Sequence, residues 1–266
     1  MGVYVTHQLS LEQDFRQAVT SQSDELKLYY QAKMDFKTLK VHGAEALIRW
    51  QHPTKGLLFP DSFIPLAEST GLIVELGAWI IEEAIKQVLL WQEKFSQNIQ
   101  VSINLSARQF QDKNLVPLIR SLMDKYDVNP SLLEFEITES ISMSNIADNL
   151  IIMGELKALG VALAIDDFGT GYSSLAYLKQ FPVDTLKIDK SFVMDMLEDD
   201  DDKVIVSTII SMSKALGLAT VAEGVETQAH AKLLQEMECD IAQGYLYSKA
   251  ISKEDFLAFV SRSRES

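Results

Sequence analysis

The chain has 266 residues, of which 47% are hydrophobic and 23% are charged, a composition typical of globular proteins with one large domain or two small ones. Its formal net charge of −14 argues against general nucleic-acid binding, which requires a basic patch. The sequence contains neither a membrane-spanning apolar run nor a signal-peptide pattern, and its single cysteine, Cys239, excludes an internal disulfide. We therefore predict a cytoplasmic location, with any membrane attachment supplied by regions outside this chain.

The predicted elements begin with an amphipathic helix over residues 11–19. We interpret residues 1–25 as a lead-in helix or junction, and residues 26–262 as the domain proper. Within that domain, short runs rich in β-branched and apolar residues predict strands, and helical periodicity predicts the helices between them. The predicted strands are 28–33, 44–50, 100–105, 133–138, 161–166, 185–189, 219–223 and 240–245. The predicted helices are 79–95, 146–159, 203–216 and 228–237.

The order of these elements predicts the fold class. From the second strand onward, strands alternate with helices, which indicates a parallel sheet, and this number of strands favours a (β/α)₈ barrel. Only Met34 to Gly43 separate the first two strands, and this segment is too short for a parallel crossover. We therefore predict an α/β fold, a modified TIM-type (β/α)₈ barrel whose first strand is antiparallel to the second. A doubly wound open sheet is the alternative.

Polar side chains lie at the C-terminal ends of most predicted strands. In a barrel these ends meet at one mouth, where active sites are built. The set consists of acids, amides and one lysine, and none of the four histidines belongs to it. Its members are Glu45, Asn104, Glu136, Asp166, Asp167, Lys187, Asp189, Glu223 and Gln243. So many polar groups at one mouth indicate a functional site, because a barrel interior normally holds few of them.

The residue types in this set indicate a metal-dependent reaction. Oxygen ligands without imidazole or thiolate favour a hard cation, Mg²⁺ or Mn²⁺, over zinc or copper. Asp166 can be shared between two ions while the adjacent Asp167 reaches the second, and Gly169 and Gly171 allow the next loop to bend close to the site. Two divalent ions are the usual apparatus of phosphodiester hydrolysis. We expect two Mg²⁺ or Mn²⁺ ions, with Ca²⁺ supporting nucleotide binding but inhibiting hydrolysis.

Seven short motifs occur in order along the chain. They are Glu45-Ala46-Leu47, Asn104-Leu105-Ser106, Glu136-Ile137-Thr138-Glu139, Asp166-Asp167-Phe168-Gly169-Thr170-Gly171, Lys187-Ile188-Asp189, Ala222-Glu223-Gly224-Val225-Glu226 and Gln243-Gly244. In these motifs the sequence resembles the EAL family of cyclic di-GMP phosphodiesterases. The resemblance implies hydrolysis of cyclic di-GMP to linear pGpG, which lowers this bacterial second messenger.

The resemblance also implies roles for individual residues. The ligands of the first metal would be Glu45, Asn104, Glu136 and Asp166, and those of the second would include Asp166 and Asp167. Lys187 would orient the attacking water, Glu223 would act as a metal-linked acid or base, and Glu139 would anchor the loop after Asp167. The substrate-binding residues would be Gln31, Leu47, Arg49, Asp189, Gln243 and Glu226, with Gln243 also holding a metal-bound water.

Two other functions compete with this hypothesis. The first is a module that binds cyclic di-GMP or a protein without turnover, which would be expected to lose some of the acids. The second is a different Mg²⁺-dependent barrel enzyme, such as an enolase-type lyase, which has no use for the pair Asp166-Asp167. The sequence leaves homodimer formation open, and the resemblance favours attachment to a sensory or GGDEF domain in the full-length protein.

Overall fold

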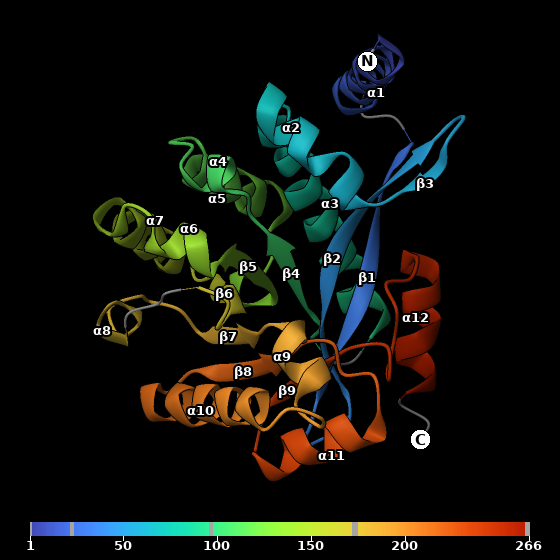
Figure 1. Ribbon diagram of the computed structural model, residues 1–266. Helices are drawn as coiled ribbons and strands as arrows, with labels where there is room; N and C mark the ends of the chain where they lie inside the picture. The colour runs from blue at the N-terminus through green and yellow to red at the C-terminus, as the bar shows by residue number, and fades with distance from the viewer. Residues whose placement is uncertain (1, 22–23, 96–97, 172–174, 264–266) are drawn as a thin grey trace.

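Eight strands close into a barrel in the computed structural model, which describes residues 2–21, 24–95, 98–171 and 175–263, with side chains from residue 11 onward. The sheet order is β1-β9-β8-β7-β6-β5-β4-β2, and pairing of β1 with β2 closes it, as Figure 1 shows. The strands are β1 (Leu26–Asp35), β2 (Val41–His52), β3 (Gly56–Leu58), β4 (Gln100–Asn104), β5 (Leu133–Thr138), β6 (Ala162–Phe168), β7 (Thr185–Ile188), β8 (Ala219–Ala222) and β9 (Ile241–Gln243). Closure excludes the doubly wound alternative.

Strand β1 runs against its neighbours, as the sequence predicts. It pairs antiparallel with β2, where Gln31 lies opposite Glu45, and antiparallel with β9. A tight turn makes this possible, because Asp35 Oδ1 accepts hydrogen bonds from the backbone N–H groups of Lys37 and Thr38 at 2.9 and 2.7 Å. The remaining barrel strands are parallel. The short strand β3 is not among the predicted strands, and it pairs with β2 to extend this hairpin.

Helices surround the barrel in Figure 1. The longer ones are α1 (Gly2–Thr20), α3 (Ile73–Lys94), α5 (Leu115–Tyr126), α7 (Ile146–Ala158), α10 (Asp200–Leu216), α11 (Gln228–Glu236) and α12 (Lys253–Arg262). The shorter ones are α2 (Ile64–Thr70), α4 (Ala107–Phe110), α6 (Glu139–Met143), α8 (Leu175–Leu178) and α9 (Lys190–Asp195), with 3₁₀ turns η1 (Pro60–Ser62) and η2 (Pro130–Leu132). Within the described ranges, none of the helices is long and apolar enough to cross a membrane.

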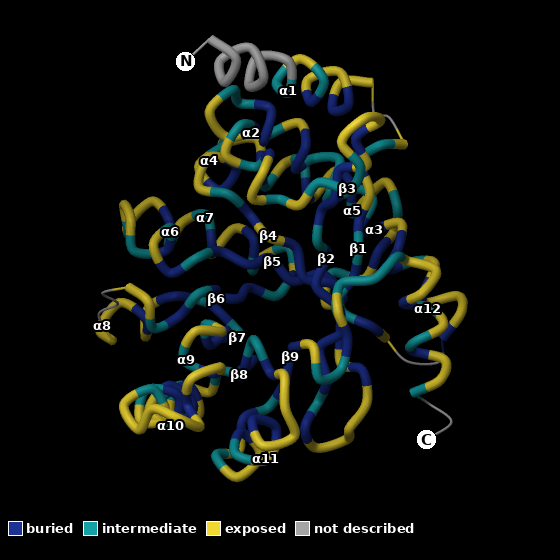
Figure 2. The backbone as a smooth tube through the Cα atoms, turned by 45° about the vertical axis from the view of Figure 1, so that its right-hand side comes forward, coloured by how far each residue is buried: buried dark blue, intermediate teal, exposed yellow. Residues whose placement is uncertain are grey.

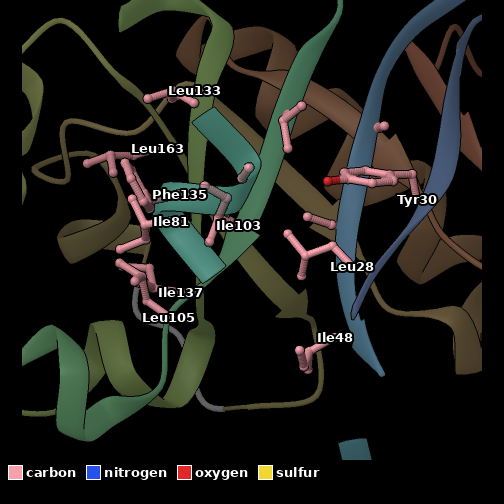
Figure 3. Close-up of a cluster of buried hydrophobic side chains, with 14 of the residues drawn as sticks. Leu28, Tyr30, Ile48, Ile81, Ile103, Leu105, Leu133, Phe135, Ile137 and Leu163 are labelled. Carbon is pink, nitrogen blue, oxygen red and sulfur yellow. The ribbon is translucent and has the colours of Figure 1, made fainter. Parts of the chain in front are cut away.

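The hydrophobic core lies between the strands and the surrounding helices. Figure 3 shows Ile81 of α3 beside Ile103, Phe135 and Ile137, whose side chains leave the barrel on its outer face. These side chains are almost fully buried. Removing one of them would cost about 2–5 kcal/mol of stability. Figure 2 shows the result, with buried strands at the centre and exposed outer turns on the helices.

The inner face of the barrel is polar instead. Side chains alternate along a strand, so the residues that face inward are those between the core residues. Ser102, Glu134, Thr185 and Lys187 are examples, and all four are buried. A buried polar group is costly unless it is hydrogen-bonded, so the contacts of these groups determine what the barrel can do.

Helix α1 packs on the β2 side of the barrel. Phe15 is fully buried, with its ring centroid 5.1 Å from that of Trp50 in an edge-to-face arrangement and 5.4 Å from that of Phe63. Ala18 and Val19, one turn further along, are also buried. The helix is therefore joined to the barrel by apolar contacts as well as by the chain.

Candidate active site

Lys187 lies at the centre of the barrel mouth, among carboxylates from several strands. Its Nζ is 2.6 Å from Glu136 Oε2, 2.7 Å from Glu223 Oε1 and 3.0 Å from Asp166 Oδ2. Glu45 Oε2 is 3.6 Å away. Burial disfavours the charged ammonium, but Asp166, Glu136 and the other carboxylates raise the pKa of Lys187 well above its usual value. Four acids thus share one cation at this point.

Two amides hold the carboxylate of Glu45. Asn104, exposed at the end of β4, donates through Nδ2 to Glu45 Oε1 at 2.7 Å, and Gln243 of β9 donates through Nε2 to Glu45 Oε2 at 2.6 Å. The same Gln243 nitrogen lies 3.2 Å from Gln31 Oε1, and Gln31 donates to the backbone oxygen of Ser248 at 2.9 Å. Gln243 Oε1 is buried without a hydrogen-bond partner among the described residues, which leaves one acceptor for a ligand or water.

The backbone at Asp166 and Asp167 departs from a regular strand. Adjacent residues of a strand normally point to opposite faces. Here the register with β7 shifts between Ile165 and Phe168, and Asp167 adopts a φ of 54°. This left-handed conformation costs roughly 1–2 kcal/mol in a non-glycine residue. In return, carboxylate oxygens of Asp166, Asp167 and Glu223 all lie within 4.8 Å of one another.

Burial also perturbs the acidity of these groups. It raises the pKa of Glu223 to about 8 and that of Asp166 to about 6, although Lys187 opposes both shifts. Burial raises the pKa of Asp167 as well, and the neighbouring carboxylate of Asp189 adds to this effect. The mouth thus holds more carboxyl groups than its lysines can neutralise once all are ionised, and a bound cation would favour their ionised forms.

Glu139, the first residue of α6, is buried against the loop that follows β6. Its Oε2 accepts hydrogen bonds from the backbone N–H groups of Gly169 at 2.9 Å and Gly171 at 3.2 Å. A Cβ at residue 171 would lie 2.8 Å from Glu139 Oε1, so a larger residue there would displace this carboxylate. Residues 172–174, the next part of the predicted loop, lie outside the described residues.

The predicted substrate-binding residues fall into two groups. Half-buried Leu47 and buried Arg49 follow Glu45 on the inner face of β2, and Asp189 lies beside Asp167 while capping α9 through the backbone N–H of Ser191. Glu226 is exposed on the loop between β8 and α11, and no described contact brings it to the carboxylates. The structure thus gathers these residues around the mouth, with the exception of Glu226.

A second lysine, Lys33, lies deeper in the barrel and is not among the site residues predicted from the sequence. Its Nζ donates to Glu136 Oε1 at 2.6 Å, Ser102 Oγ at 2.6 Å and Glu134 Oε1 at 3.0 Å, and Thr185 donates to the other oxygen of Glu134 at 3.0 Å. Glu136 is thus held between two ammonium groups, and they lower its pKa to about 2 against the effect of burial. Gln31 and Lys33 are two residues apart and so share one face of the strand. This spacing could have predicted that Lys33 also faces the site.

Comparison with known proteins identifies the family. The sequence model described as EAL domain matches residues 12–250. The chain belongs to the EAL domain family.

This EAL domain is 45% identical over 98% of its length to the signaling protein YkoW of Bacillus subtilis (strain 168). It is 42% identical, again over 98% of its length, to the bifunctional diguanylate cyclase/cyclic di-GMP phosphodiesterase MucR of Pseudomonas aeruginosa. The domain spans 32% of YkoW and 38% of MucR. Its fold is also similar to that of the PaMucR phosphodiesterase in complex with c-di-GMP, with a TM-score of 0.89, 42% identity, and coverage of 93% of this chain and 99% of that one.

The mouth of the EAL domain fits a hard divalent cation. The oxygens of Asp166, Asp167 and Glu223 are close enough to share one ion. Carboxylate and amide oxygens are the ligands that Mg²⁺ and Mn²⁺ prefer. Gln243 Oε1, which has no hydrogen-bond partner in the described part of the chain, adds another such oxygen. The excess of carboxylates around Lys187 would be balanced by such an ion.

Proposed function

We propose that this EAL domain hydrolyses cyclic di-GMP to linear pGpG with the help of two divalent cations, Mg²⁺ or Mn²⁺. The observation that carries the proposal is the cluster of Asp166, Asp167 and Glu223 oxygens within 4.8 Å beside the buried ammonium of Lys187. The match to the EAL family and the similarity to a phosphodiesterase solved with c-di-GMP support the choice of substrate.

The two ions would be held by different parts of the mouth. We assign Glu45, Asn104, Glu136 and Asp166 to one ion, and Asp166, Asp167 and Glu223 to the other. When bound, such ions stabilise negative charge on a phosphodiester and increase the acidity of a water molecule. The contacts between Asn104 and Glu45, between Lys187 and Asp166, and among the oxygens of Asp166, Asp167 and Glu223 support this assignment.

The remaining residues act on the substrate and on water. Lys187 Nζ would orient the attacking water by donating a hydrogen bond to a lone pair of the water oxygen. Glu223 would accept the proton that this water loses. Arg49 would bind a phosphate, since it is buried and the described residues offer it no ion pair. In the balanced reaction, water adds to one phosphorus, and one P–O bond to a ribose oxygen breaks as that oxygen takes up a proton.

A product assay tests this proposal. Purified protein with Mg²⁺ or Mn²⁺ should convert cyclic di-GMP to pGpG, and the metal-free protein should not. Binding of cyclic di-GMP without turnover would favour the binding-module hypothesis instead. The lyase alternative predicts neither binding nor turnover of cyclic di-GMP. The closeness of the Asp166 and Asp167 carboxylates argues against a lyase, which has no use for this pair.

We also propose a setting for the domain. Residues 26–262 would form the catalytic barrel, and residues 1–25 would be the junction to a sensory or GGDEF domain in a cytoplasmic part of the full-length protein. The support is that relatives such as MucR are more than twice as long as this chain, which spans 38% of MucR. Light scattering of the purified chain would test whether it forms a homodimer.

A further inference from the structure

The guanidinium of Arg49 lies close to two aromatic rings. Its Cζ is 4.8 Å from the ring centroid of Phe59 and 5.7 Å from that of Tyr29. Arg49 is only 8% exposed, whereas Phe59 is 54% exposed. Phe59 therefore contacts a buried cation while its own ring stays half exposed. Phe59 is not among the residues that the sequence predicts for the site.

The position of the Phe59 ring is set by the backbone around it. Strand β3, which ends at Leu58, pairs with β2 so that Leu58 lies opposite Trp50, the residue after Arg49. The backbone oxygen of Phe59 then accepts hydrogen bonds from Ser62 N at 3.0 Å and Ser62 Oγ at 2.6 Å, which closes the turn η1. The β2–β3 hairpin and the turn η1 together place the Phe59 ring next to the guanidinium of Arg49 on the neighbouring strand.

The two rings constrain Arg49 without using its hydrogen-bond donors. A guanidinium has two flat faces and five N–H donors in its plane. Aromatic rings attract its faces through cation–π contacts. One nitrogen, Nη1, donates to the backbone oxygen of Ile48 at 2.8 Å. Within the described ranges no other hydrogen bond engages the guanidinium, so its remaining donors can bind an anionic ligand. A guanidinium fixed in this way loses less freedom when it binds one.

We propose that Phe59 is a positioning residue that holds Arg49 in place for a phosphate group of the substrate. The inference rests on the proposed function, because that function supplies the anionic ligand. Phe59 then contributes to substrate affinity through Arg49 rather than by contact with the ligand or through the chemical step.

The test compares four substitutions by steady-state kinetics with cyclic di-GMP and Mg²⁺. Loss of one cation–π contact should raise KM about two- to fivefold in Phe59→Ala and in Phe59→Leu, which keeps apolar bulk without a π-system. Phe59→Trp should keep the parent KM. The rate constant kcat should change little in all three variants, because binding common to ground and transition states is lost. Val204→Ala, at an exposed apolar residue of α10, is the matched control and should match the parent.

A double-mutant cycle with Arg49→Ala decides whether Phe59 acts through Arg49. In the Arg49→Ala background, Phe59→Ala should raise KM no further. An equal increase in both backgrounds would show that the ring contacts the substrate directly, and an unchanged KM in Phe59→Ala would show no role. Either result overturns the inference.

The proposed function can fail separately from this inference. If the parent protein binds cyclic di-GMP without hydrolysing it, the phosphodiesterase proposal fails, and calorimetric Kd values of the same variants replace KM in the cycle. If the parent neither binds nor hydrolyses cyclic di-GMP, both proposals are overturned.

Discussion

Removal of the Glu139 carboxylate should release the loop that follows Asp167. Hydrogen bonds to a charged group contribute about 1.5–3 kcal/mol each, and Glu139 accepts two, of which the one from Gly171 is long at 3.2 Å. The other oxygen, Oε1, is buried without a described partner, so its removal recovers about 1–3 kcal/mol. We therefore expect Glu139→Ala to weaken the anchoring of this loop by about 2 kcal/mol, or roughly thirtyfold in population.

The same change should affect Asp167, because the anchored loop begins at this strained residue. With φ at 54°, Asp167 would relax toward extended backbone if Gly169 were no longer held, and its carboxylate would leave Asp166 and Glu223. Phosphodiesterase activity and Mn²⁺ affinity should both fall in Glu139→Ala, by a product assay and by calorimetry. Glu139→Gln is the matched control, since its amide oxygen can still accept both bonds, and it should lose less.

A Glu139→Ala variant that keeps the parent rate and the parent Mn²⁺ affinity would contradict this role of the loop. Circular dichroism and thermal unfolding must show a folded barrel, because Glu139 is buried. A loss of activity with unchanged metal affinity would show that the loop acts on the substrate alone.

Three further predictions address the charges of the mouth. Lys33→Met should lower the free energy of unfolding by about 3–5 kcal/mol in urea titrations, because it leaves Glu134 and Glu136 as buried charges without their shared cation. The double variant Lys33→Met/Glu134→Gln should recover part of this loss. Equal stability of the single and the double variant would contradict the prediction. Asp167→Asn should reduce hydrolysis by orders of magnitude and cyclic di-GMP affinity only modestly, and a near-parent rate would exclude the second metal site. Replacement of Mg²⁺ by Ca²⁺ should preserve binding but not hydrolysis, and comparable turnover would refute the metal-activated nucleophile.

The fold could be read from the sequence because each strand carries its own local signal. The runs of β-branched and apolar residues, and the short segment between Met34 and Gly43, were sufficient for the barrel and its reversed strand. Strand β3 and helices such as α5 and α12 were not predicted. Strand β3 has only three residues and depends on its pairing with β2, so tertiary contacts rather than local pattern determine it.

The site was less predictable where it departs from the pattern of parallel strands. Glu136 and Asp166 can be predicted because they lie at the C-terminal ends of parallel strands. Lys33 lies on the antiparallel strand, whose C-terminal end points away from the mouth. Phe59 lies outside the predicted elements, and only the β2–β3 hairpin brings its ring to Arg49. The conformation of Asp167 likewise accompanies a register shift between β6 and β7, which residue spacing in the sequence does not predict.

The reversal of β1 also decides where the chain enters the barrel. Had this strand been parallel to the others, its first residue would lie at the end opposite the carboxylates. Instead, Leu26 pairs with Trp50 near the C-terminal end of β2, and α1 packs through Phe15 on the same Trp50. A displacement of α1 would therefore act directly on the rim of the barrel beside Arg49, and not on its opposite end.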